Sequence, residues 1–453
     1  MPGSSPGMTI KEDRAHSPQS SAFICVHLGS PPMSDALKPT TPAEVVDAVA
    51  QAVADEAPLE IVGQGSKRGL GRPVQAARQL GLSGLAGITL YEPNELVLTC
   101  GAGTPLAEIE AALRENNQQL AFEPADLAPL YAGASGAGTI GGALSCNLAG
   151  PRRLKAGAAR DHFLGFKAVS GRGEAFQAGG RVVKNVTGYD LCKLMAGAHG
   201  TLAVLTEVTI KVLPAPEKSR TVLIYGLDDR SAVRALSRAL NSPHEASGAA
   251  HLPAAVAARS TVDFVAGSGR AVTAIRVEGP GPSVEHRCES LRRELQDVGP
   301  TEELHSMRSS LLWREVRDTA PLLPDAASLI WRLSVPPAAG AQVIADIYPP
   351  PRSGGGQGGG RATSRAVEYY LDWGGGLVWL ALPPSDDASA AFVRAAVARH
   401  GGHATLLRAP DATRLAVPVF EPQSESLAAL ARRVKYAFDP RRVLNPGRMA
   451  ADL

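Results

Sequence analysis

The sequence has few cysteines and no long apolar run, and each shortage excludes a class of protein. The cysteines are Cys25, Cys100, Cys146, Cys192 and Cys288. They include no C-x-x-C pair, so neither an iron–sulfur cluster nor a cysteine-based zinc site has the ligand spacing that it needs. They indicate reduced thiols in a cytosolic protein. No apolar run approaches the ~20 residues of a membrane-spanning helix, and none has the length of a signal-peptide core.

Net charge is also nearly absent. Lys plus Arg total 46 and Asp plus Glu total 44, a formal charge of +2. We therefore expect no nucleic-acid partner and at most peripheral association with a membrane. The chain instead has 47 glycines and 35 prolines at an ordinary hydrophobic content of 44%. This combination predicts a folded protein rich in loops of defined backbone conformation.

The composition predicts four segments. Residues 1–39 are rich in Ser and Pro and have no apolar periodicity, which predicts a disordered tail. Met33 begins a more ordinary N-terminus, so we expect that the start codon used lies upstream of the natural one. Residues 40–214 end at a Pro-Ala-Pro boundary, and 215–410 form a second, α+β domain. That domain contains a low-complexity loop, 349–361, which we expect to be mobile. Residues 411–453 form a C-terminal segment.

Periodicity and turn residues predict the elements of an α+β protein. Helices are expected after a Thr41-Pro42 cap, over 105–116 and over 425–438. Strands are expected in the first domain over 59–62, 95–100, 163–170, 175–178 and 202–212, and in the second over 220–225, 271–277, 329–335 and 376–382.

Two glycine-rich segments, 63–69 and 133–150, stand out between these elements. The second contains a formal G-x-G-x-x-G, but no strand pattern precedes it, so a Rossmann unit is not indicated. No P-loop spacing is present either, which argues against a nucleoside triphosphatase. Both segments have backbone N–H groups that could line a pyrophosphate, although either alone could be a tight turn.

The most specific string is Lys184-Asn185-Val186-Thr187-Gly188-Tyr189-Asp190, followed by Gly200-Thr201-Leu202. Together with the glycine loops, Arg160-Asp161 and the C-terminal Asn445-Pro446-Gly447, it resembles one family of FAD-binding domains. This family is shared by vanillyl-alcohol oxidase, p-cresol methylhydroxylase and the D-2-hydroxyacid dehydrogenases. The chain is most similar to the FAD-binding subunits of glycolate oxidases. The motifs occur in the family order over 40–214.

The resemblance implies a two-part FAD-binding domain of the p-cresol methylhydroxylase type, an α+β cap domain and a C-terminal return to the first domain. It also implies that the two glycine loops wrap the FAD pyrophosphate by backbone donors and that the turn at Gly200 holds the adenine side. The implied cofactor-binding residues are Gly63, Gln64, Gly65, Ser66, Lys67, Gly138, Thr139, Ile140, Gly141, Gly142, Ser145, Asn147, Asp161, Gly200, Thr201 and Val204. For Ser145, Asn147 and Asp161, local hydrogen bonds are an equally good interpretation.

Two departures from the family pattern limit what the resemblance implies. The first loop lacks the histidine through which some members attach FAD, so we expect non-covalent FAD. The chain also lacks the metal-binding His pair and the Glu-His-Gly segment of the catalytic D-2-hydroxyacid dehydrogenases, so no metal is expected. His403 is a lone histidine there and is more typical of a structural residue. His162 and His199 are expected to be satisfied interior histidines.

Two functions remain open. The first is an FAD-binding subunit of a multi-subunit glycolate oxidase that converts glycolate to glyoxylate, with a catalytic flavoprotein homologue and an iron–sulfur subunit as partners. The second is a free-standing FAD-dependent dehydrogenase of small 2-hydroxy acids, in which Arg332 or Lys184 binds the carboxylate and His403 is a further weak catalytic candidate. In either case we expect a cytoplasmic protein, peripheral at the inner face of the membrane at most through its complex.

Overall fold

The computed structural model describes residues 36–181, 188–348 and 367–453. Asp35–Leu453 forms one compact unit. Lys184 and the loop 349–361 lie outside the described residues, as does most of the expected tail. Ala36–Leu37, which the composition assigns to that tail, forms strand β1 and pairs with β3 (Arg78–Gly81).

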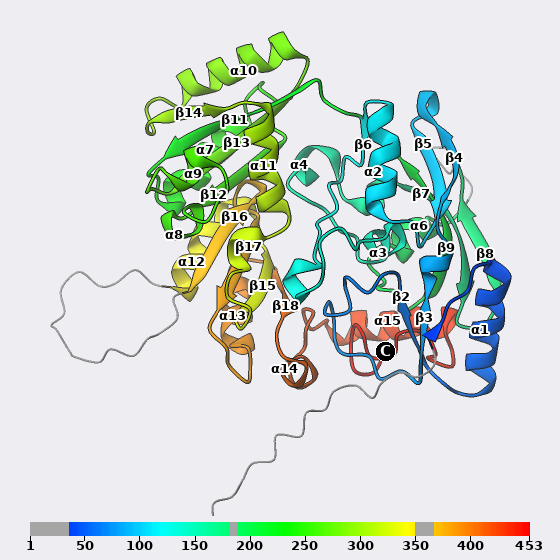
Figure 1. Cartoon of the computed structure of the whole chain (residues 1–453). Coiled ribbons are helices and arrows are strands. Elements are labelled where there is room, and N and C mark those ends of the chain that lie inside the picture. The colour runs from blue at the N-terminus through cyan, green and yellow to red at the C-terminus, as the bar shows by residue number, and fades with distance from the viewer. Residues whose placement is uncertain (1–35, 182–187, 349–366) are drawn as a thin grey trace, which may run out of the picture. The chain divides into compact units, whose positions relative to one another are not determined.

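The N-terminal part, residues 36–214, contains two main sheets (Figure 1). The smaller is parallel, in the order β1-β3-β2, with β2 at Leu59–Val62. The larger is antiparallel and is composed, in spatial order, of β4 (Ile88–Glu92), β5 (Val97–Gly101), β9 (Ala203–Lys211), β7 (Phe163–Ser170) and β8 (Ala175–Gly179). Short strands β6 (Gln118–Gln119) and β10 (Leu213–Pro214) pair beside it.

The helices of this part are α1 (Pro42–Ala54), α2 (Leu106–Glu115), α3 (Ile140–Ser145), α4 (Arg153–Ala156), α5 (Ala159–His162) and α6 (Leu191–Met195). Helix α1 begins as its sequence predicts, because the Thr41 hydroxyl accepts a hydrogen bond from the Glu44 N–H and Pro42 occupies the first turn. Its Val45, Val49 and Ala52 follow the helical period and are buried.

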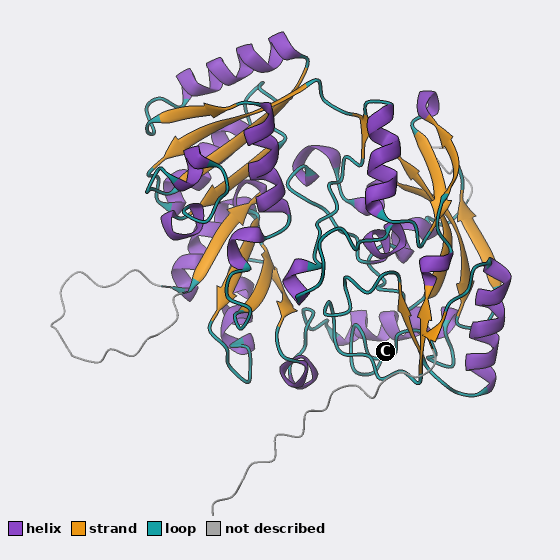
Figure 2. Cartoon of the chain, in the orientation of Figure 1, coloured by secondary structure: helices purple, strands orange, loops and turns teal. Residues whose placement is uncertain are grey.

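The middle part, residues 218–408, is a single antiparallel sheet with helices (Figure 2). Its strands, in spatial order, are β14 (Thr301–Leu304), β11 (Lys218–Tyr225), β13 (Val272–Gly279), β12 (Gly248–Leu252), β16 (Glu368–Asp372), β17 (Leu377–Leu382), β15 (Leu329–Ser334) and β18 (His403–Arg408). Its helices are α7 (Asp229–Leu240), α8 (Ala254–Ala257), α9 (Asp263–Ala266), α10 (Gly281–Glu294), α11 (Ser306–Arg317), α12 (Gly340–Ile347) and α13 (Ala390–Ala398).

Alternation along the strands gives this sheet two different faces. On β15, Trp331 and Leu333 belong to the apolar core that α12 and α13 cover. The alternate residues, Arg332 and Ser334, line a cavity on the opposite face. The period of two therefore places a charged residue of a buried strand at the wall of a cavity rather than in the core.

The C-terminal segment returns to the N-terminal part, as the sequence predicts. It contains α14 (Asp411–Ala416) and α15 (Glu425–Phe438), and its Leu444 pairs with Leu59 of β2 in a parallel bridge. Lys435 on α15 is buried and donates to the Thr201 carbonyl at 2.7 Å and to Asp439 Oδ2 at 2.7 Å. These contacts attach the last residues of the chain to β2 and to the turn before β9.

Most predicted elements are confirmed with small shifts at their ends. The predicted α+β class is also confirmed. Glycine-rich 133–150 contains helix α3, whose Ile140 and Leu144 are fully buried. The helix begins at Thr139, whose hydroxyl accepts from the Gly142 N–H.

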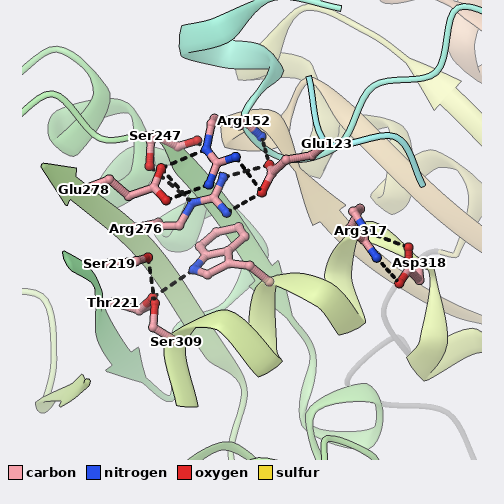
Figure 3. A network of polar contacts seen from close by, with 12 residues as sticks. Glu123, Arg152, Ser219, Thr221, Ser247, Arg276, Glu278, Ser309, Arg317 and Asp318 are labelled. Carbon is pink, nitrogen blue, oxygen red and sulfur yellow. Dashed lines mark hydrogen bonds and ion pairs between the residues drawn. The ribbon is translucent and has the colours of Figure 1, made fainter. Parts of the chain in front are cut away.

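Four charged residues join the N-terminal and middle parts, and we call them the ion-pair cluster (Figure 3). Arg276 is buried, and the side chains of Glu123, Arg152 and Glu278 are 10–13% exposed. Arg276 of β13 donates to both carboxylate oxygens of Glu123, at 2.8 and 2.9 Å. Arg152 donates to both oxygens of Glu278, also on β13, at 2.9 and 2.7 Å. Because each part contributes to both pairs in two-pronged geometry, the cluster fixes the orientation as well as the contact.

The pKa of Glu278 follows from this arrangement. Burial raises the pKa of its carboxyl, but the Arg276 and Arg152 guanidiniums outweigh burial and hold the pKa at about 2. A carboxyl whose folded pKa lies below its ordinary value contributes stability that is complete above the ordinary range and is lost as the pH falls toward the folded value. The loss for Glu278 therefore falls between about pH 4.5 and pH 2.

We predict that Glu278→Gln lowers the free energy of unfolding by ~3 kcal/mol at pH 7, because one partner of a buried ion pair is left uncompensated. Below pH 4.5, the free energy of unfolding of the variant should also decrease less than that of the wild type. Urea unfolding over a pH series measures both. Glu289→Gln, at an exposed ion pair on α10, should behave as the wild type. A Glu278→Gln protein with wild-type stability and wild-type acid sensitivity would contradict the structural role of the cluster.

Candidate functional site

One cavity lies where the first glycine loop, helix α3 and the C-terminal segment meet. It contains about 750 Å³ of free space, its open mouth included, and we call it the glycine-loop cavity. The predicted residues that line it are Gly63, Gln64, Gly65, Ser66, Lys67, Thr139, Gly141, Gly142, Ser145 and Gly200. The structure thus brings both predicted glycine segments and the Gly200 turn to one place.

The first loop follows directly from β2. A Cβ on Gly63 would lie 2.4 Å from Thr139 Oγ1, so only glycine allows the loop to pack against the start of α3. Gly65 has φ +81°, a conformation that other residues rarely adopt. Within the described ranges, the main-chain N–H groups of Gln64 to Lys67 donate to no acceptor. Successive free N–H groups of this kind form a concave anion-binding site.

Lys67 adds a positive charge to this loop. Burial lowers the pKa of its amine, an effect that Cys146 and Asp126 only partly oppose. Its Nζ donates to Ser66 Oγ at 3.1 Å, and no carboxylate of the described residues forms an ion pair with it. A buried ammonium without a carboxylate partner indicates a site for an anionic ligand.

The second glycine segment contributes differently from the expectation that its backbone donates to a pyrophosphate. The N–H groups of Ile140, Gly141 and Gly142 donate to Thr104 O at 3.0 Å, Ala102 O at 2.9 Å and Thr139 Oγ1 at 3.3 Å, respectively. These donors are already satisfied within the protein. This part of the segment therefore forms a wall of the cavity, whereas the N–H groups of Gly138 and Thr139, like those of the first loop, donate to no acceptor within the described ranges.

Close packing explains why Gly141 is glycine. A Cβ there would lie 2.6 Å from the Ala102 carbonyl oxygen, which is backbone and cannot move aside easily. At Gly142 the nearest atoms are the Thr139 hydroxyl at 3.2 Å and Lys67 Nζ at 3.5 Å. A side chain at Gly142 would therefore enter the cavity, whereas one at Gly141 would strain the fold.

The remaining predicted cofactor residues lie outside this cavity and have local partners. Gly138 O accepts from the Leu106 N–H, and Ile140 belongs to the core. For the side chains, the local interpretation agrees with the structure. Asn147 Oδ1 accepts a hydrogen bond from the Arg160 N–H at 3.0 Å, and Asp161 Oδ2 accepts one from the Ala158 N–H at 2.9 Å. Thr201 Oγ1 donates to the Ala198 carbonyl at 2.7 Å. Val204 is fully buried in β9.

The C-terminal segment supplies cavity residues that the sequence analysis did not assign. Asn445 Oδ1 accepts from the Ile61 N–H and its Nδ2 donates to the His199 carbonyl, both at 2.8 Å. One side chain thus connects β2, which leads into the first loop, with the turn at Gly200. Arg448 is buried and donates to the carbonyls of Arg68 and Leu70 at 2.8 and 3.1 Å. The Asn445-Pro446-Gly447 motif of the sequence could have indicated that Asn445 lies at the cavity.

The two interior histidines differ from each other. His162 is buried and its ring contacts the Ala156 and Lys211 carbonyls, as expected of a satisfied histidine. His199 lines the cavity, and no described residue forms a hydrogen bond with its ring. Burial, assisted by the nearby Arg448, lowers the pKa of His199 to about 4. His199 is therefore neutral at neutral pH and available to a ligand.

A second cavity adjoins the first and shares Leu70, Cys146 and His199 with it. We call it the arginine cavity because Arg153 and Arg332 line it, and His403 lies at its edge on β18. Burial, together with Arg153, lowers the pKa of Arg332 to about 10. Burial and Arg332 also lower the pKa of His403. The structure thus brings two of the three weak catalytic candidates together.

The described residues contain no group of three or more His, Cys, Asp or Glu side chains that could hold a metal ion. His403 accordingly has no partner ligands there. Cys100, Cys192 and Cys288 are buried, and burial raises the pKa of each thiol to about 12. The described cysteines are separate free thiols.

Comparison with known proteins shows which proteins the chain resembles. A family model described as an FAD binding domain matches residues 35–179. The chain is 34% identical over 409 residues to the glycolate oxidase subunit GlcE of Escherichia coli (strain K12), covering 90% of this chain and 97% of that protein. It is 34% identical to a D-2-hydroxyglutarate dehydrogenase of Xanthomonas citri pv. viticola over 39% of this chain and 35% of that protein.

Solved structures share the fold at low sequence identity. The structure of p-cresol methylhydroxylase with bound substrate matches with a TM-score of 0.65 at 14% identity, over 92% of this chain and 88% of that one. The 4-ethylphenol oxidase of Gulosibacter chungangensis matches with a TM-score of 0.66 at 15% identity, over 92% and 89%. The predicted p-cresol methylhydroxylase type of fold is confirmed.

The residues around the glycine-loop cavity fit an FAD pyrophosphate. Four free N–H groups and the Lys67 ammonium offer donors and charge to phosphate oxygens, and a Cβ at Gly142 would occupy the space beside them. The first loop would hold the pyrophosphate. The arginine cavity adjoins the glycine-loop cavity.

We predict that Gly142→Leu abolishes FAD retention in a folded protein, because the new side chain enters the cavity next to Lys67 Nζ. Leucine is also a better helix former than glycine, so α3 should remain stable. The flavin content of the purified protein and its circular dichroism spectrum measure the two properties.

Gly180→Leu is the matched control, because a Cβ on Gly180 has nothing within 4 Å. It should retain FAD as the wild type does. Stoichiometric FAD in folded Gly142→Leu would remove this wall from the cofactor site. Gly141→Leu is unsuited to the purpose, since it would lose flavin through a disturbed fold.

Proposed function

The chain belongs to the family of FAD-linked oxidoreductases that includes the glycolate oxidase subunit GlcE, and we propose that it is the FAD-binding subunit of a multi-subunit glycolate oxidase. In this proposal the complex oxidises glycolate to glyoxylate and releases two electrons and two protons. The observation that carries the proposal is the glycine-loop cavity, whose first loop offers free N–H groups and the Lys67 ammonium to a pyrophosphate, in a chain similar over most of its length to a glycolate oxidase subunit.

The residues of the chain have distinct roles in this proposal. Bound FAD would supply two-electron redox chemistry. The N–H groups of the first loop and Lys67 would hold its pyrophosphate. Arg332 would bind the carboxylate of a 2-hydroxy acid only in the alternative function below. Residues 40–214 and 411–453 form the FAD-binding domain and 215–410 the cap.

Two features support a division of labour with partner subunits. No cluster of metal-ligating side chains occurs in the described part of the chain, so the metal-assisted chemistry of the catalytic relatives has no counterpart there. The described thiols are also separate, and the five cysteines of the sequence have no cluster spacing. We therefore assign substrate turnover to a catalytic flavoprotein homologue and onward electron transfer to an iron–sulfur subunit.

The proposed location follows from the complex. None of the helices in the described ranges is both long enough and apolar enough to cross a bilayer. Any association with the inner face of a membrane would therefore be peripheral and would depend on partner subunits.

A specific observation favours a second candidate function. The arginine cavity is intact beside the cofactor cavity, with Arg332 and His403 at its wall. Neutral His403 could accept the hydroxyl proton of a substrate held by Arg332. On this alternative the chain is a free-standing FAD-dependent D-2-hydroxyacid dehydrogenase.

We predict that the FAD is bound without a covalent link, because the first loop contains Gln64, Ser66 and Lys67 and no histidine. Acid precipitation should release all flavin into the supernatant. A yellow pellet would contradict the prediction, and Cys146 and His199, which line the cavity, would be the first attachment points to test.

The division of labour predicts that the purified chain alone is yellow but is not bleached by glycolate at a rate comparable with that of the complex. Addition of the catalytic flavoprotein and the iron–sulfur subunit should restore glycolate-dependent reduction of a dye. Anaerobic stopped-flow absorbance measures the rate in both cases. Full-rate bleaching of the chain alone would overturn the proposal in favour of the free-standing dehydrogenase.

A further inference from the structure

The arginine cavity contains two guanidinium groups that converge on one aromatic ring. The Cζ atoms of Arg153 and Arg332 lie 4.9 and 5.1 Å from the centre of the Trp373 ring. Arg153 begins helix α4 of the N-terminal part, whereas Arg332 is on β15 of the middle part. The pair therefore exists only because the two parts meet at this cavity.

Neither guanidinium forms an ion pair or a side-chain hydrogen bond with any of the described residues, so neither has a carboxylate partner there. The Asp161 carboxylate attracts the Arg153 guanidinium only electrostatically, at longer range, and its Oδ2 accepts a hydrogen bond from the Ala158 N–H. Asp372 acts similarly on Arg332, but burial raises the pKa of Asp372 to about 7, so this carboxyl is only partly ionised at neutral pH. The protein leaves two cations uncompensated.

A third, independent feature points to a missing acceptor. Trp379 lines the cavity and is opposite Arg332 in the β15–β17 register. It is only 6% exposed, and its Nε1 has no hydrogen-bond partner among the described residues. A buried indole N–H normally finds an acceptor. A ligand oxygen in the cavity would satisfy it.

The ion-pair cluster fixes the position of Arg153. Its neighbour Arg152 is bonded through the side chain to Glu278 and through the N–H to Glu123 at 2.7 Å. Two residues earlier, the Gly150 carbonyl accepts from Trp373 Nε1 at 3.1 Å. The segment before α4 is thus attached to the middle part on both sides, and Arg153 is held beside Trp373.

We propose that the arginine cavity binds a ligand of the class of small dicarboxylates, with one carboxylate on Arg332 and Trp379 and the second on Arg153. This inference rests on the proposed function only in placing FAD in the adjoining glycine-loop cavity. A monocarboxylate such as glycolate neutralises one guanidinium and leaves the other without a partner. A dianion neutralises both, and each carboxylate can accept two hydrogen bonds from a guanidinium.

Equilibrium binding of probes that cannot be oxidised tests the inference without any turnover. The probes are malonate, which has two carboxylates, its monomethyl ester, which has nearly the same shape and one charge, and acetate. Isothermal titration calorimetry on the FAD-loaded full chain, at neutral pH and constant ionic strength, measures each affinity. Malonate should bind at least tenfold more tightly than the monoester or acetate.

Variants identify the two carboxylate positions. Arg153→Gln should lower malonate affinity to that of the monoester and leave acetate affinity unchanged. Arg332→Gln should weaken all three probes. Arg160→Gln, which removes an exposed arginine outside the cavity, is the matched control and should change none of them. Arg153→Lys should recover part of the malonate affinity, because it restores the charge without the two-pronged geometry.

Equal affinities for malonate and its monoester would overturn the proposal. An Arg153→Gln loss that is the same for acetate as for malonate would also overturn it, because both arginines would then hold one carboxylate. The proposal would also be overturned if none of the three probes bound. None of these results depends on glycolate oxidation by the complex, so failure of this inference and failure of the proposed function are separable.

Discussion

The arrangement of the site depends on the ion-pair cluster of Glu123, Arg152, Arg276 and Glu278. One buried and three largely buried charges are costly to desolvate, and they are stable here because each carboxylate receives two hydrogen bonds from a guanidinium of the other part of the chain. The same contacts hold the segment that leads into Arg153. The ion-pair cluster, which joins the two parts of the chain, thereby also sets the distance between Arg153 and Arg332 in the arginine cavity.

The shape of the glycine-loop cavity depends on a different constraint, the close approach of backbone segments. Gly63 packs on Thr139, and Gly141 packs on the Ala102 carbonyl, so neither position has room for a side chain. Asn445 then joins β2 to the Gly200 turn through two hydrogen bonds. The result is a rigid wall at the second glycine segment, opposite a first loop whose N–H groups remain free. Rigid walls with unpaired donors are suited to a bound pyrophosphate.

The sequence predicted the elements well where local signals are strong. Helix α15 has the predicted bounds, 425–438, and strands β2 and β7 do as well. It could not predict which N–H groups remain free, because the partners of Gly141 and Gly142 come from the β5–α2 turn and from Thr139. It also missed Arg153, since a basic residue in a short helix has no pattern of its own. Its partner residues Arg332 and Trp373 lie about 180 to 220 positions later in the sequence.

The central claim is that the free donors of the first glycine loop hold the FAD pyrophosphate, with the flavin ring beside the arginine cavity. A crystal structure of the FAD-loaded chain tests it most directly. We expect the pyrophosphate oxygens within hydrogen-bond distance of the N–H groups of Gln64 to Lys67, with the flavin ring directed toward Arg332. A pyrophosphate bonded instead to the N–H groups of Ile140 to Gly142, or a flavin ring directed away from the arginine cavity, would contradict the account.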